Sequence, residues 1–303
     1  MAARATRSAS RKARRCEEAV ATGPLGALSH DELGVIFDGL ADPLQPVVAV
    51  ALGSTCLGLR TPLRAALVVL MERHARAKAL SRKLGLSCEE LRDAQCLHAS
   101  GNLVADDMAT LGMILSKWLP RLKRHHLVQN RFGDGGMHEL CEGLGQGAAP
   151  SLRVLGLNNN KLGPLGAEAL AAALRRGAMP QLDSLLIESN PFGNQGVAAL
   201  APALRKLPEL AMRLLSGCEI GDEGVTSLFA NLGKHDFKKL EYLDLSRNDD
   251  LTDKSCACLV AALDSGALPR LCKIYFVHVA KISGQARNAM YDALERAVEH
   301  RAS

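Results

Sequence analysis

The residues best suited to bind a metal ion lie between positions 125 and 141. Imidazole nitrogen and thiolate sulfur are common zinc ligands, and this stretch holds His125, His126, His138 and Cys141. His138 and Cys141 lie three residues apart, so they can share one face of a helix. His126, however, falls on the predicted strand that leads into this helix, on the opposite surface. The sequence therefore predicts no metal site and no cofactor.

Two glycine-rich stretches invite comparison with a phosphate-binding loop. They are GDGG at 133–136 and GLGQG at 143–147. Such a loop needs a Lys-Ser/Thr pair or an acidic partner downstream, and neither stretch supplies one. We interpret the first as the turn from a strand into a helix and the second as the exit from that helix. Since there is also no nucleophile elbow and no pair of metal-binding carboxylates, the sequence predicts no catalytic residues and a protein that is not an enzyme.

The nine cysteines form no CxxC pair and no regular framework. Their number is odd and no signal peptide precedes them, which favours reduced thiols in an intracellular compartment, cytoplasmic or nuclear. The longest uncharged run, residues 43–59, is too short and too interrupted by proline to span a bilayer. The sequence therefore predicts no membrane span.

The formal net charge of +5 is concentrated at the start of the chain. Six Arg and Lys residues and no acid lie among the first fifteen positions, so the other 288 residues carry a net charge of −1. A nucleic-acid-binding domain usually carries its positive charge on the folded body, so nucleic acid is not an expected partner. Residues 1–24 are predicted to be a basic disordered tail, with a nuclear-import patch or an organelle transit peptide as alternatives.

The elements that must position any site come from an internal repeat. The pattern Leu-x-x-Leu-x-Leu-x-x-Asn, clearest in LRVLGLNNN at 152–160, begins near residues 94, 122, 152, 182, 210, 240 and 271. After each pattern come, in most copies, two glycines and then apolar residues at helical spacing. This resembles the leucine-rich repeat family, in its ribonuclease-inhibitor-like subtype. The resemblance implies an α/β solenoid, shaped like a horseshoe, with about seven strand–helix repeats over residues 94–298.

The leucines of each repeat are expected to point into the solenoid, and the asparagine side chain to bind backbone groups of neighbouring turns. We expect local irregularity where His125 and Arg213 replace leucine, where Cys218 replaces asparagine, and at the extra residues Asp250 and Lys281. The polar closing helix suits a terminal cap, followed by a short tail over residues 299–303.

Residues 25–75 do not fit the repeat and are predicted to be a small all-helical module, with a helical connector over 76–93. Ser29 and Glu32 have the spacing of a capping box. The segment resembles an F-box through Leu28, Asp31, Glu32, Leu33, Ile36, Phe37 and Leu40, and then Leu52, Ser54, Cys56, Leu59 and Arg60. The resemblance implies binding to the adaptor of a cullin-type ubiquitin ligase through Leu28, Leu33, Ile36 and Phe37. The alternative is a helical cap that seals the first repeat.

Strand residues between the inward leucines should form the concave face of the solenoid. An apolar centre with aromatic and charged ends suits the binding of a protein partner. The residues expected to contact this partner are Arg124, His126, Asn158, Leu186, Glu188, Met212, Leu214, Tyr242, Asp244, Arg247, Lys273 and Tyr275.

The sequence thus predicts a non-catalytic interaction protein, and the order of its two segments resembles that of a substrate receptor of a ubiquitin ligase. One alternative is a structural or scaffold subunit of a larger assembly. A weaker one is a GTPase regulator, since the Ran GTPase-activating protein resembles the same repeat subtype. That family ends in a long acidic tail, whereas this chain ends in VEHRAS.

Overall fold

The computed structural model describes residues 28–54, 57–205, 207, 215–229, 231–233 and 236–302. The basic tail predicted over 1–24, Cys56 and Arg213 lie outside these residues, as do the side chains of Ser54, Leu59 and Arg60. The chain divides into two compact units, Met1–Arg92 and Asp93–Ser303. The second unit begins at the place where the repeats are expected to start.

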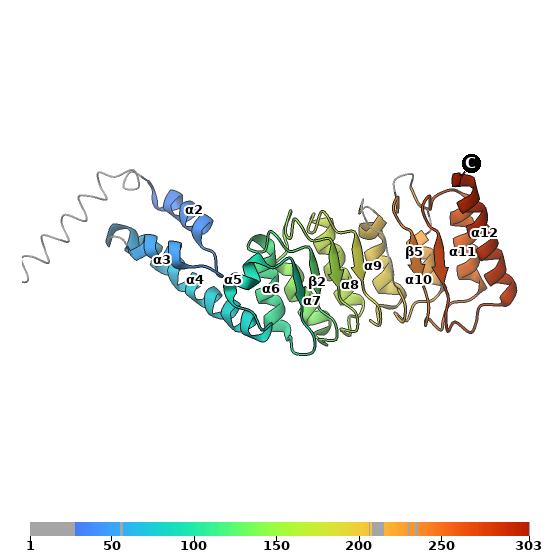
Figure 1. The fold of residues 1–303 in the computed structure, drawn as a ribbon, viewed down its shortest axis with the longest axis horizontal. Coiled ribbons are helices and arrows are strands. Elements are labelled where there is room, and N and C mark those ends of the chain that lie inside the picture. The colour runs from blue at the N-terminus through green and yellow to red at the C-terminus, as the bar shows by residue number, and fades with distance from the viewer. Residues whose placement is uncertain are drawn as a thin grey trace, which may run out of the picture. The chain divides into compact units, whose positions relative to one another are not determined.

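The N-terminal unit is helical (Figure 1). Its helices are α2 (His30–Leu40), α3 (Val47–Ser54), α4 (Leu57–Lys83) and α5 (Cys88–Asp93), the last of which ends at the unit boundary. Helix α4 runs through residue 75, so the predicted change from module to connector does not coincide with a break between elements. None of the helices in the described residues is both long and apolar enough to cross a lipid bilayer.

Helix α2 begins where the capping box predicts. The backbone nitrogen of Ser29 donates to Glu32 Oε2 at 2.8 Å, and the backbone nitrogen of Glu32 donates to Ser29 Oγ at 3.2 Å. These two bonds satisfy backbone donors that have no partner within the first helical turn. Leu33 and Phe37, one turn apart, then face Leu63 and Leu70 of α4 in the core of the unit.

In the C-terminal unit, each repeat whose strand lies within the described residues pairs a three-residue strand with a helix. Four parallel strands form one sheet in the order β1 (Cys96–His98), β2 (Arg124–His126), β3 (Val154–Gly156) and β4 (Ser184–Leu186). A second parallel pair joins β5 (Tyr242–Asp244) and β6 (Lys273–Tyr275). The strand expected near residues 212–214 lies outside the described residues.

The helices of this unit pack against one another in chain order (Figure 1). They are α6 (Ala105–Lys117), α7 (Gly133–Glu142), α8 (Pro164–Arg175), α9 (Gly193–Arg205), α10 (Asp222–Phe229), α11 (Asp253–Asp264) and α12 (Gly284–Ala302). Helix α12 continues to Ala302, so residues 299–302 extend the closing helix instead of forming the predicted tail. The central residue of every strand is buried, because strand side chains alternate and this one faces the helices.

The asparagines join successive repeats as predicted. The Asn190 side chain donates to the carbonyls of Leu157 and Ile187, both at 2.9 Å, and its Oδ1 accepts from the backbone nitrogens of Asn160 and Leu162 at 2.9 and 3.1 Å. Asn248 makes the same four bonds two repeats later, to Leu215, Leu245, Cys218 and Ile220. Each buried amide thus satisfies backbone groups of its own repeat and of the preceding one.

The irregularity predicted at residue 125 is absent. His125 occupies the buried leucine position and keeps β2 in regular register, opposite Leu97 and Leu155. The extra residues of the last two repeats lie beside each other, with Lys281 Nζ 2.7 Å from Asp250 Oδ1. The core of the stack therefore accommodates His125 in place of leucine, and the extra residues Asp250 and Lys281 lie at its surface.

Candidate functional site

The side chains that flank the buried centre of each strand point away from the helices. They form the face predicted to be concave, which we call the strand face. Of the residues predicted on it, Arg124, Arg247, Lys273 and Tyr275 are exposed, and His126, Asn158, Leu186, Glu188, Tyr242 and Asp244 are half-buried. Met212 and Leu214, predicted to form its apolar centre with Leu186, lie outside the described residues.

The C-terminal end of the strand face combines aromatic and charged side chains. Tyr242 pairs in register with Lys273, and Asp244 pairs with Tyr275, so the two tyrosines lie on a diagonal across neighbouring strands. Lys273 Nζ lies 5.6 Å from the centre of the Tyr242 ring, within the range of a cation–π contact. Tyr275 keeps 42% of its surface exposed. This end therefore offers rings and charges that a partner can contact.

Acidic groups lie close to this aromatic end. Burial raises the pKa of Glu188, and the neighbouring carboxylate of Asp244 raises it further, while the guanidinium of Arg247 acts in the opposite direction. Asp244 Oδ1 accepts a bond from the backbone nitrogen of Ser246 at 2.9 Å. Glu188, Asp244 and Arg247 thus form one electrostatic group at this end of the strand face.

A hollow of about 510 Å³ adjoins β6 on the side of helix α12. The residues that line it include Tyr275 from the strand and Tyr291, Glu295 and Glu299 from the helix. The hollow shares Lys273 and Tyr275 with the strand face, so the exposed aromatic surface continues around the edge of the sheet.

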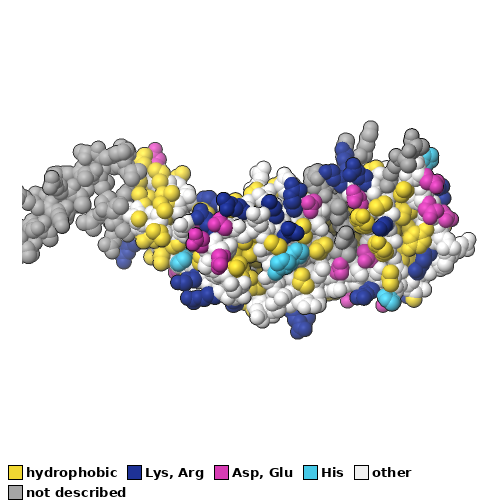
Figure 2. Space-filling model, in the orientation of Figure 1, with side chains coloured by type: hydrophobic (Ala, Val, Ile, Leu, Met, Phe, Trp, Pro, Cys, Tyr) yellow, Lys and Arg dark blue, Asp and Glu magenta, His cyan; other side chains and the backbone are white. Residues whose placement is uncertain are grey.

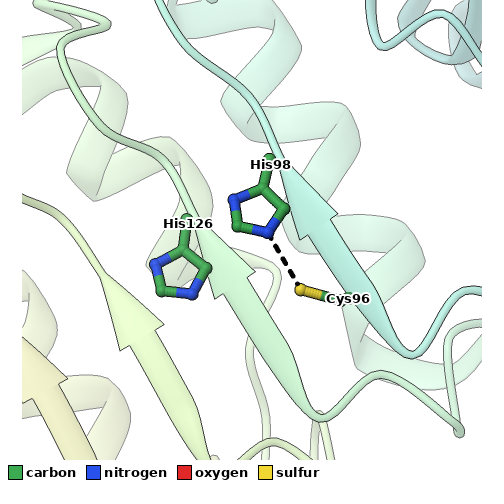
Figure 3. Close-up of side chains that lie close together, drawn as sticks. All are labelled: Cys96, His98 and His126. Atoms are coloured by element: carbon green, nitrogen blue, oxygen red, sulfur yellow. Dashed lines mark hydrogen bonds between the residues drawn. The ribbon is translucent and has the colours of Figure 1, made fainter.

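A second group lies at the opposite, N-terminal end of the strand face. Cys96 and His98 project from β1, and His126 projects from β2 opposite His98 (Figure 3). Cys96 Sγ lies 3.2 Å from His98 Nε2, and the two imidazole rings stack at 4.7 Å with 5° between their planes. The sulfur and one nitrogen of each ring lie within 4.8 Å of one another. Burial and the neighbouring His98 lower the pKa of His126, which favours its neutral form at pH 7.

The sequence pattern had indicated His126 together with His125, His138 and Cys141, and not with Cys96 and His98. The structure places His125 inside the core, His138 exposed on α7 and Cys141 buried on that helix. The overlooked signal was the repeat register. Cys96 and His98 have the two-residue spacing of one strand face, and His126 follows His98 by 28 residues, one repeat later.

The cysteines buried in the repeats are packing residues. Burial raises the pKa of Cys141 and of Cys218 to about 12, and that of Cys256 to about 11. A thiol with so high a pKa carries almost no thiolate at pH 7, and the thiolate is the reactive form. Cys218, which replaces a ladder asparagine, donates instead to the carbonyl of Ile187 at 3.4 Å.

The structure changes which residues of the F-box-like segment can reach a partner. Phe37 is only 1% exposed and Leu33 is also buried, because both face the core of the unit, and Leu28 is partly buried against that core. Only Ile36 of the four predicted contacts is exposed. Figure 2 shows apolar side chains gathered over α2 and α3, and the exposed ones are Val35, Ile36, Leu40, Val47 and Val48.

Three segments of the chain match the "Leucine Rich repeat" family model: residues 148–171, 215–229 and 238–260. Together with the parallel strands and the asparagine ladder, this match supports the predicted leucine-rich repeats. Comparison with curated proteins gave no match.

Three solved structures that are similar to this chain share only 15–16% of its sequence. The tropomodulin C-terminal domain of Caenorhabditis elegans is 15% identical, with a TM-score of 0.38 over 65% of this chain and 96% of that one. Actin-binding site 2 of leiomodin-1 is 16% identical, with a TM-score of 0.32 over 55% and 74%. The yeast Rad7 and Elc1 complex gives 16% identity and a TM-score of 0.35 over 97% and 78%. At these scores the similarities do not bear on function.

Proposed function

We propose that this leucine-rich repeat chain is a non-catalytic interaction protein that binds a protein partner on its strand face. The observation that carries the proposal is the set of large side chains held outward at the C-terminal end, Tyr242, Lys273 and Tyr275. Tyrosine supplies much contact area at low cost in conformational entropy, and it is enriched among residues that dominate binding energy. Parallel pairing fixes the spacing of these side chains before a partner arrives.

Removing both rings should weaken partner binding and leave the fold intact. In a Tyr242→Ala/Tyr275→Ala variant of the full chain, we expect the affinity for a partner recovered by affinity purification to fall about tenfold to a hundredfold. Circular dichroism and the melting temperature should change little, because both rings lie outside the core. Calorimetric titration of wild type and variant with the purified partner measures the difference.

The matched control removes exposed charges from the helical side. Glu168 and Arg175 are exposed on α8, beside a hollow that α7 and α8 line. Arg176 is unsuitable for this purpose because its guanidinium donates to the carbonyl of Cys141 at 2.6 Å and so caps α7. Full affinity in the tyrosine variant, with a loss in Glu168→Ala/Arg175→Ala, would move recognition to the helices.

For the N-terminal unit we propose a second contact, with the adaptor of a cullin-type ubiquitin ligase. Its support is the apolar surface of α2 and α3, where Val35 is 73% exposed beside Ile36 and Leu40. An exposed apolar cluster of this kind is typical of interaction sites. In this proposal Leu33 and Phe37 hold α2 against α4, and the exposed residues contact the adaptor.

A charge placed on that surface should abolish the contact. In a Val35→Asp/Ile36→Asp variant of the full chain, we expect adaptor affinity to fall at least about tenfold, because a carboxylate would be buried without a partner. The full chain is used because cutting at residue 75 would divide α4. Leu165→Asp, at an exposed apolar position of α8, is the control and should bind normally. If the wild-type chain does not bind the adaptor at micromolar concentration, the proposed contact is wrong and the helical cap remains as the interpretation of this unit.

A further inference from the structure

We propose that Cys96, His98 and His126 bind a zinc-class divalent metal ion at the N-terminal end of the strand face. One thiolate and two imidazoles form a donor set that zinc shares with few other abundant cations, since Mg²⁺ and Ca²⁺ take oxygen ligands.

The distances between the donors are close to those that a metal requires. Zn–S and Zn–N bonds of about 2.3 and 2.0 Å in a tetrahedron place the ligand atoms about 3.3–3.6 Å apart. The distance from Cys96 Sγ to His98 Nε2 is already 3.2 Å, and all three donors lie within 4.8 Å. Closing the set around one ion requires rotations of the side chains that tilt the two parallel rings, so that their nitrogen lone pairs converge on the ion.

The backbone holds these three side chains in place. Alternation along β1 puts Cys96 and His98 on the same face, and parallel register puts His126 beside His98. Both strands are paired, and β2 is paired on its two edges. A site built on hydrogen-bonded strands is better preorganised than one built on loops.

The next residue across the sheet leaves room for the His126 ring. Gly156 is the partner of His126 in register on β3. A Cβ atom at Gly156 would lie 2.8 Å from His126 Nδ1, which is too close for unchanged packing. The absence of a side chain there lets His126 lie flat against His98, whereas any larger residue would push the ring from its present position.

Three protein ligands leave one tetrahedral position unfilled, and it faces solvent because Cys96 and His98 are exposed. A water molecule, or a side chain of a partner bound on the strand face, can occupy that position. Arg124, opposite Cys96 in register, adds a positive charge beside the proposed site. The thiolate of Cys96 offsets one of the two positive charges of the ion.

Cobalt is a suitable probe because Co²⁺ takes the place of Zn²⁺ and its bond to a thiolate absorbs in the near ultraviolet. The full chain, kept reduced, freed of metal with a chelator and then dialysed, is titrated with Co²⁺. We expect one equivalent to bind with the sulfur-to-cobalt absorption, and Zn²⁺ to abolish that absorption. Cys96→Ser should lose the absorption, and His98→Ala or His126→Ala should weaken binding about a hundredfold or more.

Controls remove a thiol and an imidazole of similar exposure elsewhere in the unit, namely Cys272→Ser and His138→Ala, and both should retain wild-type binding. Circular dichroism without metal establishes that every variant is folded. Cobalt binding without the sulfur band, retention of the band in Cys96→Ser, or equal losses in the controls would each overturn the proposal. Wild-type protein that binds no cobalt would do the same.

Discussion

Replacing Asn190 by alanine should lower the free energy of unfolding by about 2–6 kcal/mol, because two buried backbone nitrogens lose their acceptor, at a cost of about 1–3 kcal/mol each. The side-chain oxygen of Asn190 accepts from the backbone nitrogens of Asn160 and Leu162. The carbonyls of Leu157 and Ile187, which accept from its amide nitrogen, also accept from Asn160 Nδ2 and Cys218 Sγ. Solvent does not reach these groups in the folded protein, since Asn190 is fully buried. Denaturant unfolding monitored by circular dichroism measures the loss.

Asn158 provides the matched control for this substitution. It lies on the strand face, half-buried, and its Oδ1 accepts one bond from the backbone nitrogen of Glu188 at 3.0 Å. Water can reach this position, so Asn158→Ala should cost less than about 1 kcal/mol. Equal losses in the two variants would show that the buried ladder is not what holds the repeats together.

Replacing His125 by leucine should stabilise the protein, and the gain should grow as the pH falls. Neither ring nitrogen of His125 has a hydrogen-bond partner among the described residues, and its neighbours in register are Leu97 and Leu155. Burying a polar group without a partner costs about 1–3 kcal/mol. Leucine fits the site, because leucine occupies it in the adjacent repeats.

The pH dependence follows from the pKa of this ring. Burial lowers the pKa of His125 from 6.5 to about 3, so the unfolded chain takes up the proton more readily than the folded one. The wild type should lose about 1.4 kcal/mol per pH unit below about pH 6.5, reaching about 2 kcal/mol at about pH 5. The loss continues until the pH reaches the folded pKa, and His125→Leu should lack this contribution.

Unfolding curves at several pH values, recorded with a metal chelator present, compare the wild type with His125→Leu. His138→Leu, at an exposed position on α7, is the control and should follow the wild type at every pH. Parallel curves for the wild type and His125→Leu would mean that His125 is accessible to protons in the folded state.

The repeated elements were predictable because their signals are local and recur. A leucine at a strand centre, an asparagine three positions after the last leucine and an apolar helical face depend only on spacing within about thirty residues. Leu155, Leu185 and Leu243 are buried as expected, and Asn160, Asn190 and Asn248 are buried with them. The capping box of Ser29 and Glu32 was predictable for the same reason, since a cap spans a single turn.

Burial in the helical unit was harder to predict. Helical spacing identifies an apolar stripe in α2, but the stripe itself does not say which of its residues the other helices cover. Phe37 was expected at a partner interface, whereas α4 covers it and leaves Ile36 and Val35 exposed. The rotation of a helix about its own axis depends on which elements pack against it. For α2 this element is α4, whose contacting residues lie more than twenty residues further along the chain.

By itself, the sequence determined the repeat period, the inward and outward alternation and the amides that join one repeat to the next, because a period of 28 to 31 residues repeats the same local environment. The repeat register indicates which outward positions are neighbours, and tertiary structure alone decided which of their side chains come into contact. Cys96, His98 and His126 come together because parallel pairing aligns two strands without offset and Gly156 leaves space beside them. Tyr242 faces Lys273 and not Tyr275 for the same reason, since a contact between repeats depends on register and neighbouring volume, which neither segment encodes alone.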